Sequence, residues 1–155
     1  MGDLYIRGPS AALMYWGNRA KSAETFQGGW TKSGDKYHRD AAGNYVYAGR
    51  SDDMLKVSGQ FVSPFEVEAT LMKHPAVLEC AVFGKIDADG LTKTKACVVR
   101  KPGQSVDEAT LQAFVKERLA PYKYPRYIEF IDELPKTATG KIQRFRLRER
   151  EAGAR

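Results

Sequence analysis

The sequence is poor in the residues that build covalent and metal frameworks. It has 155 residues with only 2 cysteines and 2 histidines, and Cys80 and Cys97 each stand in an apolar run. A disulfide scaffold or a zinc module needs several such residues at short spacing, as in CxxC pairs or Cys/His clusters. We therefore expect both cysteines to be small buried side chains, and we predict no metal site in this chain.

Long apolar runs are also missing. No stretch approaches the roughly 20 residues that a membrane-spanning helix requires. The opening segment, residues 1–6, has no basic region leading into an apolar stretch and no Ser or Thr at the sixth position. It therefore predicts neither a secretory signal nor a myristoylation site. We expect a cytoplasmic protein that does not contact membranes.

The composition is that of a folded protein with an excess of positive charge. Apolar residues make up 43% of the chain, with 8 Tyr, 7 Phe and 2 Trp, which argues against disorder. Lys and Arg number 25 against 19 Asp and Glu, which gives a net charge of +6. This charge suits an anionic ligand such as a nucleotide, CoA or a nucleic acid, although many basic proteins bind none of these. The length accommodates one compact domain and a smaller attached piece.

Short β-strand patterns dominate the first third of the chain. Residues 3–7 alternate and predict a strand, and residues 37–47 predict a β-hairpin with its turn at Gly43-Asn44. We expect Ser33-Gly34-Asp35 to form a turn. The polar and charged residues 51–53 are typical of a linker.

Beyond the linker, strand patterns alternate with helix patterns. Ser63 and Pro64 begin a capping-box pattern, and Val67, Leu71 and Met72 are expected on one face of the helix that follows. The other elements are expected as strands at 54–57, 60–62, 77–83, 95–99 and 126–131, and as helices over 111–119 and from 144 onward. This alternation predicts a small sheet with helices packed against it.

The strongest local feature is a threonine-rich loop, residues 136–141, that ends in Gly140 and Lys141. Glycine has no side chain, so it lets such a loop approach a phosphate closely. The loop is not a P-loop, because that motif requires Gly where Pro135 stands and Ser or Thr where Ile142 stands. Taken alone, the loop favours a surface turn with a solvated lysine.

Two further segments are ambiguous when each is taken alone. Asp35, which follows a glycine, suits a pair of ribose hydroxyls, or it caps its own backbone. The run 49–60 carries both charges and contains Gly59, and it suits either a hinge or a solvated loop between strands.

In their order along the chain, these segments resemble the adenylate-forming superfamily of acyl-CoA synthetases, peptide-synthetase adenylation domains and luciferases. The order is a glycine-rich strand, Ser-Gly-Asp, a Gly-Arg-x-Asp linker, Lys-x-x-Gly with Pro-x-Glu-x-Glu, and Pro-Lys-Thr-x-x-Gly-Lys. Residues 51–56 followed by 62–68 look like the CoA ligases. Residues 8–18 and 33–37 look most like benzoate-CoA ligases.

The resemblance covers essentially the whole chain but only the last third or so of such an enzyme. It implies an α+β fold, a small mobile C-terminal domain with a short β-sheet flanked by helices, preceded by a β-rich remnant of the large N-terminal domain. Residues 1–50 would end the large domain, 51–53 would form the hinge, and 54–155 would be the mobile domain. Met1 would then start a fragment that is inactive alone.

Enzymes of this family join a carboxylate to AMP, with ATP and Mg²⁺, and then exchange AMP for CoA. The resemblance assigns Lys141 to catalysis of the first step, Asp35 and Arg50 to the ribose, and Asp52 to the hinge. The thioester and CoA face would carry Lys56, Ser58, Gly59, Gln60, Lys123 and Arg126, with Arg144 and Arg146 as further candidates for the CoA phosphates.

The expected partners are the large domain of the same protein, ATP, CoA and a carboxylic acid, benzoate or a related aromatic acid. Related ligases are switched off by acetylation of the lysine that matches Lys141, so a lysine acetyltransferase is a further candidate. Two alternatives stay open: another adenylate-forming enzyme, or a non-catalytic module whose lysine loop is acetylated. A nucleic-acid-binding domain is disfavoured, because the aromatic residues are not interleaved with basic ones as in a recognised module.

Overall fold

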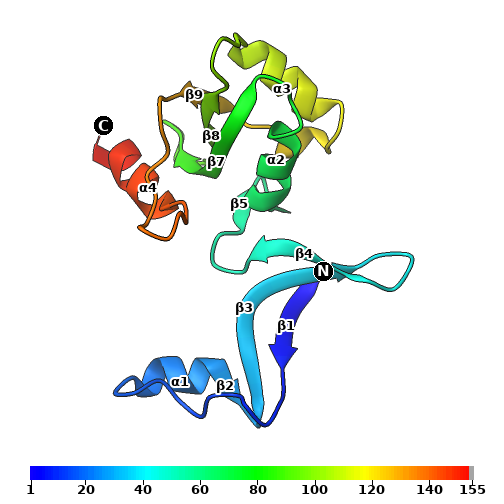
Figure 1. The fold of residues 1–155 in the computed structure, drawn as a ribbon, viewed down its shortest axis with the longest axis vertical. Coiled ribbons are helices and arrows are strands. Elements are labelled where there is room, and N and C mark those ends of the chain that lie inside the picture. Colours follow the sequence, from blue (N-terminus) through cyan, green and yellow to red (C-terminus); the bar gives the residue numbers. More distant parts are fainter. Residues whose placement is uncertain (154–155) are drawn as a thin grey trace. The chain divides into compact units, whose positions relative to one another are not determined.

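The computed structural model describes residues 1–153. The chain divides into two compact units, Met1–Asp52 and Asp53–Arg155. Figure 1 shows the elements of both units. Within residues 1–153 no helix combines the length and the apolar character that crossing a membrane would need.

The first unit is an antiparallel sheet with one helix. Its long central strand β3 (Trp30–Arg39) pairs with β1 (Gly2–Ile6), β2 (Phe26–Gln27) and β4 (Tyr45–Arg50). The predicted strand near the start and the hairpin around Gly43-Asn44 are confirmed, although β3 begins earlier than expected. Sequence patterns missed α1 (Arg19–Thr25), whose first turn is capped by the Asn18 side chain at 3.0 Å from the Lys21 amide.

The expected turn at Ser33-Gly34-Asp35 is wrong, because these residues form a bulge inside β3. Asp3 pairs with Lys36 and Tyr5 pairs with Lys32. Over this stretch β3 therefore contains more residues than the facing part of β1, which is the definition of a bulge. Gly34 accommodates the bulge with a φ of +79°, which glycine adopts without strain. A glycine that looks like a turn signal therefore lies in a continuing strand.

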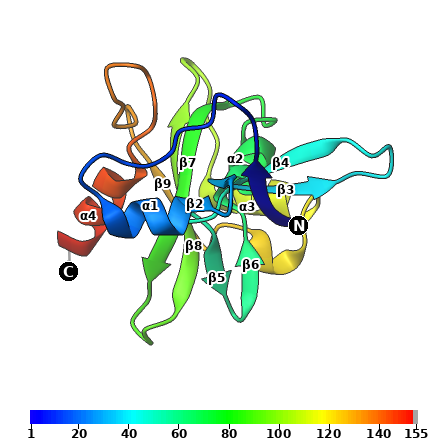
Figure 2. The same ribbon diagram turned by 90° about the horizontal axis from the view of Figure 1, so that it is seen from below.

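The second unit is built on a three-stranded sheet. β7 (Val77–Ile86) runs antiparallel to β8 (Thr92–Arg100), and β9 (Tyr127–Phe130) runs parallel to β8. Figures 1 and 2 show α2 (Pro64–Leu71) and α3 (Glu108–Lys116) on one side of this sheet and α4 (Arg144–Gly153) on the other. The hairpin of β5 (Leu55–Val57) and β6 (Gln60–Val62) precedes α2, and a 3₁₀ turn, Pro121–Lys123, precedes β9. The predicted α+β fold is confirmed.

Alternation along β7 and β8 gives the sheet two buried faces. Cys80, Val82, Ala96 and Val98 pack into a cluster with Val67, Leu71, Leu111 and Val115 of α2 and α3. Ala81, Phe83, Cys97 and Val99 pack into a second cluster with Leu134 and with Leu147 of α4. Both cysteines are free and buried as expected, and burial raises the pKa of the Cys80 thiol to about 12, which makes it unreactive.

Helix α2 begins as its sequence predicts. The Ser63 hydroxyl accepts a hydrogen bond from the Glu66 amide at 3.2 Å, and Val67 and Leu71 are fully buried. The placement of Met72 on the same face is wrong. Met72 is the C-cap and is 53% exposed, because five residues of helix rotate it well away from the direction of Val67.

Ion pairs attach α4 to its face of the sheet. The Glu151 carboxylate lies 2.6 Å from Lys85 Nζ and also contacts Lys95 Nζ. Hydrogen bonds from Lys85 and then Lys95 lower the pKa of Glu151 below its ordinary value of 4.5, although partial burial opposes them. Because the folded-state pKa lies below the unfolded-state value, this carboxylate adds stability above pH 4.5, and the contribution is lost as pH falls through the folded-state pKa.

We therefore expect Glu151→Gln to lower the urea midpoint at pH 7 and to lower it much less at about pH 3. Urea denaturation at the two pH values measures the difference. Glu149→Gln, an exposed carboxyl on the same helix, is the control and should change the midpoint little at either pH. Equal losses for Glu151→Gln at both pH values would show that the ion pairs do not provide the stability.

Candidate functional site

Asp35 and Arg50 lie opposite each other on β3 and β4 of the first unit. Arg50 Nη1 is 3.5 Å from Asp35 Oδ1, and Arg50 Nε is 3.2 Å from Asp52 Oδ1. The guanidinium covers Gly34, where an added Cβ would stand 3.2 Å from Nη2. A side chain at residue 34 would therefore require the Arg50 guanidinium to shift slightly, and the positive φ is the stronger reason for glycine here. A single arginine holds the predicted ribose carboxylate and the predicted hinge carboxylate.

A solvent-open hollow of about 180 Å³ lies beside Arg50. Its lining includes Lys21 and Lys32, and also Glu24, whose carboxylate pairs with Lys21 at 3.2 Å. The hydrogen bond from Arg50 lowers the pKa of Asp52 despite partial desolvation, which keeps this carboxylate charged. Basic side chains around a small polar hollow suit an anionic or hydroxyl-rich ligand.

Lys141 stands on a hydrogen-bonded hairpin. Lys136 and Ile142 form an antiparallel bridge, and the Thr137 amide donates to the Lys141 carbonyl at 2.8 Å. The Thr137 hydroxyl accepts from the Lys141 amide at 3.1 Å and contacts the Thr139 hydroxyl at 2.9 Å. Gly140 closes the turn with a φ of +81°. The threonines therefore hold the loop in one shape before any ligand binds.

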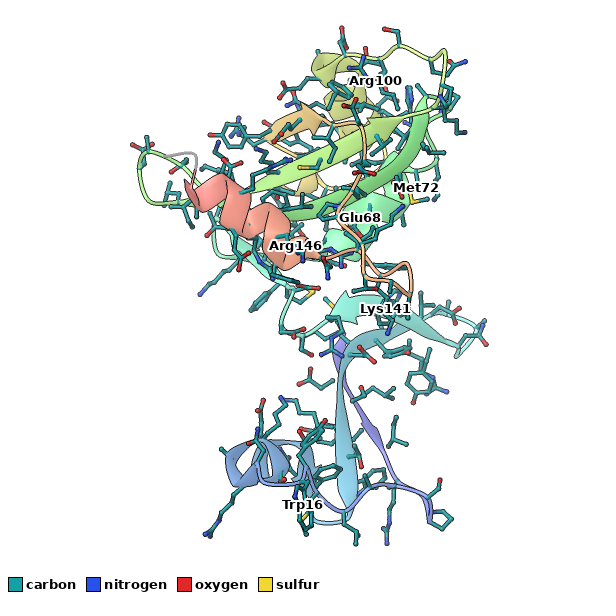
Figure 3. The ribbon with its side chains drawn as sticks, turned by 60° about the vertical axis from the view of Figure 1, so that its left-hand side comes forward. Trp16, Glu68, Met72, Arg100, Lys141 and Arg146 are labelled. Carbon is teal, nitrogen blue, oxygen red and sulfur yellow. The ribbon has the colours of Figure 1, made fainter. Side chains whose placement is uncertain are left out.

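The Lys141 side chain is exposed, and its ammonium makes no ion pair or hydrogen bond within residues 1–153. Lys136 on the same hairpin differs, because its Nζ lies 2.6 Å from Glu79. Figure 3 shows Lys141 on the segment that leads into α4. The hairpin thus presents an unpaired cation that is available to an incoming anion.

Ser58 and Gly59 form the two-residue turn between β5 and β6. Both have positive φ, +49° and +79°, as a type I′ hairpin turn requires. A Cβ added to Gly59 would meet nothing within 4 Å. Within the second unit, glycine is therefore favoured here by the backbone conformation and not by crowding. Lys56 and Gln60 flank the turn and are exposed.

Ser58 and Arg126, both predicted for the CoA face, line one hollow of about 300 Å³. Lys93, Tyr122 and Tyr124 also line this hollow. The Arg126 guanidinium lies 5.4 Å from the centre of the Tyr124 ring. Two cations beside two aromatic rings suit a ligand that carries phosphates and a flat ring. Lys93 Nζ lies 3.6 Å from Asp87 Oδ2, so it would have to exchange this partner to meet a phosphate.

Comparison with known proteins identifies the chain's family. Residues 66–141 match the AMP-binding enzyme C-terminal domain. The chain is 64% identical to the benzoate–CoA ligase of Thauera aromatica over 95% of its own length and 28% of that protein. It is 50% identical to the 4-hydroxybenzoate–CoA/benzoate–CoA ligase of Rhodopseudomonas palustris, over 99% of its length and 29% of that protein. The chain belongs to the adenylate-forming (ANL) family.

Solved structures of adenylate-forming enzymes share its fold. The anthranilate CoA ligase AuaEII in complex with anthranoyl-AMP matches with a TM-score of 0.91 and 55% identity, over 99% of this chain and 31% of that one. A benzoate CoA ligase from Burkholderia xenovorans LB400 matches with a TM-score of 0.86 and 63% identity, over 95% and 30%. The chain therefore spans less than a third of the length of these relatives and includes the part that matches the AMP-binding enzyme C-terminal domain.

Two cations predicted for the CoA phosphates already have carboxylate partners. Lys123 Nζ donates to both Glu66 oxygens, at 2.8 and 2.7 Å, and Arg144 is paired with the buried Glu68. Each would have to exchange a partner to meet a phosphate. Arg146 is exposed on α4 and makes no side-chain ion pair within residues 1–153 (Figure 3).

Sequence patterns missed Lys93, Tyr122 and Tyr124 as parts of the Arg126 hollow. The segment 122–126, Tyr-Lys-Tyr-Pro-Arg, interleaves aromatic and basic residues, and this was the available signal. Lys93 gave no such signal, because it reaches the hollow through its position on β8.

The described part of the chain, residues 1–153, holds no group of three or more His, Cys, Asp or Glu arranged for a metal ion. This absence concerns a resident metal site alone, because a Mg²⁺ that arrives with ATP is held largely by the phosphates and needs only one or two carboxylates.

Proposed function

We propose that this chain is the C-terminal part of an ATP-dependent carboxylate–CoA ligase that forms acyl-AMP and then acyl-CoA, with benzoate or a related aromatic acid as the substrate. The observation that carries the proposal is the unpaired Lys141 ammonium on a preformed hairpin. The 64% identity to a benzoate–CoA ligase supports the substrate class. Adenylate-forming CoA ligases as a group use ATP and CoA.

Lys141 would act in the first half-reaction. That step brings a carboxylate against a phosphate, so two negative groups must approach each other. An ammonium aimed at the reacting oxygens lowers the barrier by stabilising the charge that they share in the transition state. Because the hairpin is already hydrogen-bonded, little ordering is left to occur when the ligand binds.

Asp35 and Arg50 would hold the ribose of ATP and of the adenylate. A carboxylate accepts hydrogen bonds from two vicinal hydroxyls at once. Arg50, 3.5 Å from Asp35, fixes the direction of this carboxylate and adds a donor of its own. The nearby lysines of the first-unit hollow would favour the phosphates.

Residues 51–53 would be the hinge between the end of the large domain and the mobile domain. A turn at Asp52 would present the Lys141 hairpin for adenylation and the Ser58-Gly59 turn for thioester formation. Lys56, Gln60 and Lys123 would then border the CoA, and Arg126 and Lys93 would meet its phosphates beside the two tyrosine rings. One small domain would thus serve two reactions.

The exposed and unpaired Lys141 would also be accessible to a lysine acetyltransferase. Acetylation removes the positive charge of the side chain. We propose that this modification switches off the first half-reaction.

The experiment that tests the ligase assignment compares the chain alone with a fusion. In the fusion, this chain replaces the matching C-terminal part of the Thauera aromatica benzoate–CoA ligase, to which it is 64% identical. We expect benzoyl-CoA from the fusion and none from the chain alone, measured by chromatography after incubation with ATP, CoA and benzoate. The parent ligase is the positive control. Acyl-CoA formation by the isolated chain, or a folded fusion that forms no adenylate, would contradict the assignment.

A further inference from the structure

The Arg144 guanidinium joins three segments of the second unit. Its Nε and Nη2 donate to Glu68 Oε1 at 3.0 and 2.9 Å, and Nη2 also donates to Glu68 Oε2 at 2.6 Å. On its other side, Nη1 lies 3.7 Å from Asp53 Oδ2. Arg144 therefore connects α4 to α2 and to Asp53, the last residue of the proposed hinge segment 51–53.

Glu68 is itself firmly placed. It lies on α2, is 7% exposed, and accepts a hydrogen bond from the Val82 amide of β7 at 2.7 Å. The carboxylate is therefore fixed against both a helix and the central sheet. Asp53 is fixed in a similar way, because Arg148 of α4 contacts it at 3.4 Å as well as Arg144.

This cluster lies at the foot of the Lys141 hairpin. Arg144 is the first residue of α4 and follows Lys141 by three positions. The Gln143 amide donates to the Pro135 carbonyl at 2.8 Å, and Leu134 and Ile142 pack against the second core cluster. Figure 3 labels Glu68, Lys141 and Arg146 in this region. The two ends of the hairpin segment, near residues 134–135 and 142–143, are thus fixed to the domain, while Lys141 is exposed.

The ion pair fixes orientation more than it adds stability. A buried pair gains about as much from attraction as it loses in desolvation, so its net contribution to the free energy of folding is small. Its geometry is nevertheless specific, because the planar guanidinium meets both carboxylate oxygens along fixed directions. A side chain held in this way sets the direction of the backbone that carries it.

We propose that Arg144, held by Glu68 and Asp53, is a positioning residue that sets the direction of the Lys141 hairpin and ties it to the hinge. The proposal rests on the proposed role of Lys141 in adenylation. Asp53 directly follows Asp52, where the hinge turn is proposed. Through the Arg144–Asp53 contact, a rotation at Asp52 would therefore move the hairpin and the rest of the mobile domain as one body. The reacting ammonium would then arrive in the geometry that the first half-reaction requires.

Three variants separate positioning from stability. Arg144→Gln removes the cation, and Arg144→Lys keeps the charge but loses the two-pronged geometry. Arg150→Gln is the control on the same helix, because Arg150 forms a more exposed pair with Glu129 at 2.7 Å, away from the hairpin. Amide hydrogen exchange of the 155-residue chain is measured at the hairpin and, for reference, in β8.

We expect Arg144→Gln to speed exchange of the Thr137, Gly140 and Lys141 amides by about tenfold relative to β8, and Arg144→Lys to give an intermediate change. Arg150→Gln should leave hairpin exchange at the wild-type rate. In the ligase fusion, Arg144→Gln should lower kcat for adenylate formation by about tenfold with the KM for ATP unchanged. Arg150→Gln should leave both values unchanged.

Two outcomes distinguish the positioning proposal from the proposed function. If Lys141→Ala blocks adenylation while Arg144→Gln leaves hairpin exchange and kcat at wild-type values, the positioning role is overturned and the ligase assignment stands. If Lys141→Ala leaves adenylation intact, the assignment of Lys141 fails, whatever the hairpin exchange shows.

Discussion

Replacing Lys141 with alanine will lower the rate of acyl-adenylate formation by about 10²- to 10³-fold, the usual loss when one donor to a developing charge is removed. The lysine has no ion-pair or hydrogen-bond partner within residues 1–153, so its substitution leaves no carboxylate unpaired there and folding should be unaffected. Thioester formation from supplied acyl-AMP should stay near the wild-type rate, because the proposed hinge turn takes the hairpin out of the site for that step.

The two half-reactions are measured separately in the ligase fusion, by pyrophosphate release and by acyl-CoA formation from preformed adenylate. Lys136→Ala is the control, since it removes a lysine from the same hairpin that is already paired with Glu79. Lys141→Gln, or acetylation of Lys141, should behave like Lys141→Ala because the charge is lost in each case. Equal losses in both half-reactions would contradict a role confined to adenylation.

Local rules predicted the elements whose signals are local. The start of α2 follows from Ser63 and Pro64, and the β5–β6 hairpin follows from apolar residues on either side of Gly59. The bulge at Gly34 could not be predicted in the same way. A glycine before an aspartate signals a turn locally, and only the pairing of β3 with β1 shows that the strand continues.

The candidate site was predicted less completely, because its contacts join distant residues. Lys123 is paired with Glu66 across 57 positions, and Arg144 with Glu68 across 76. No local pattern shows such pairs, so every basic residue in the region looked equally available to a phosphate. The family resemblance supplied the roles of Asp35 and Arg50, while their contact depends on the register of β3 and β4.

Replacing Gly59 with leucine should lower the rate of thioester formation by about 10²-fold while adenylate formation stays near the wild-type rate. The added side chain would meet nothing within 4 Å in the second unit, so it would project outward from the turn. If this turn borders the path of the CoA thiol, as we propose, leucine would obstruct that path. Gly59→Ala should have a smaller effect, since a methyl group fills less of the space.

Backbone strain is the competing cause, because Gly59 has a φ of +79°, where any side chain costs about 1–2 kcal/mol. Gly90→Leu is the matched control, since Gly90 has a φ of +75° and also has nothing within 4 Å. The two variants should lose similar stability by urea denaturation, yet only Gly59→Leu should slow the thioester step. If Gly59→Leu and Gly90→Leu slow the thioester step equally, backbone strain is the cause. If Gly59→Leu alone slows adenylation and thioester formation equally, this turn acts in both half-reactions and does not belong to a face used only for CoA.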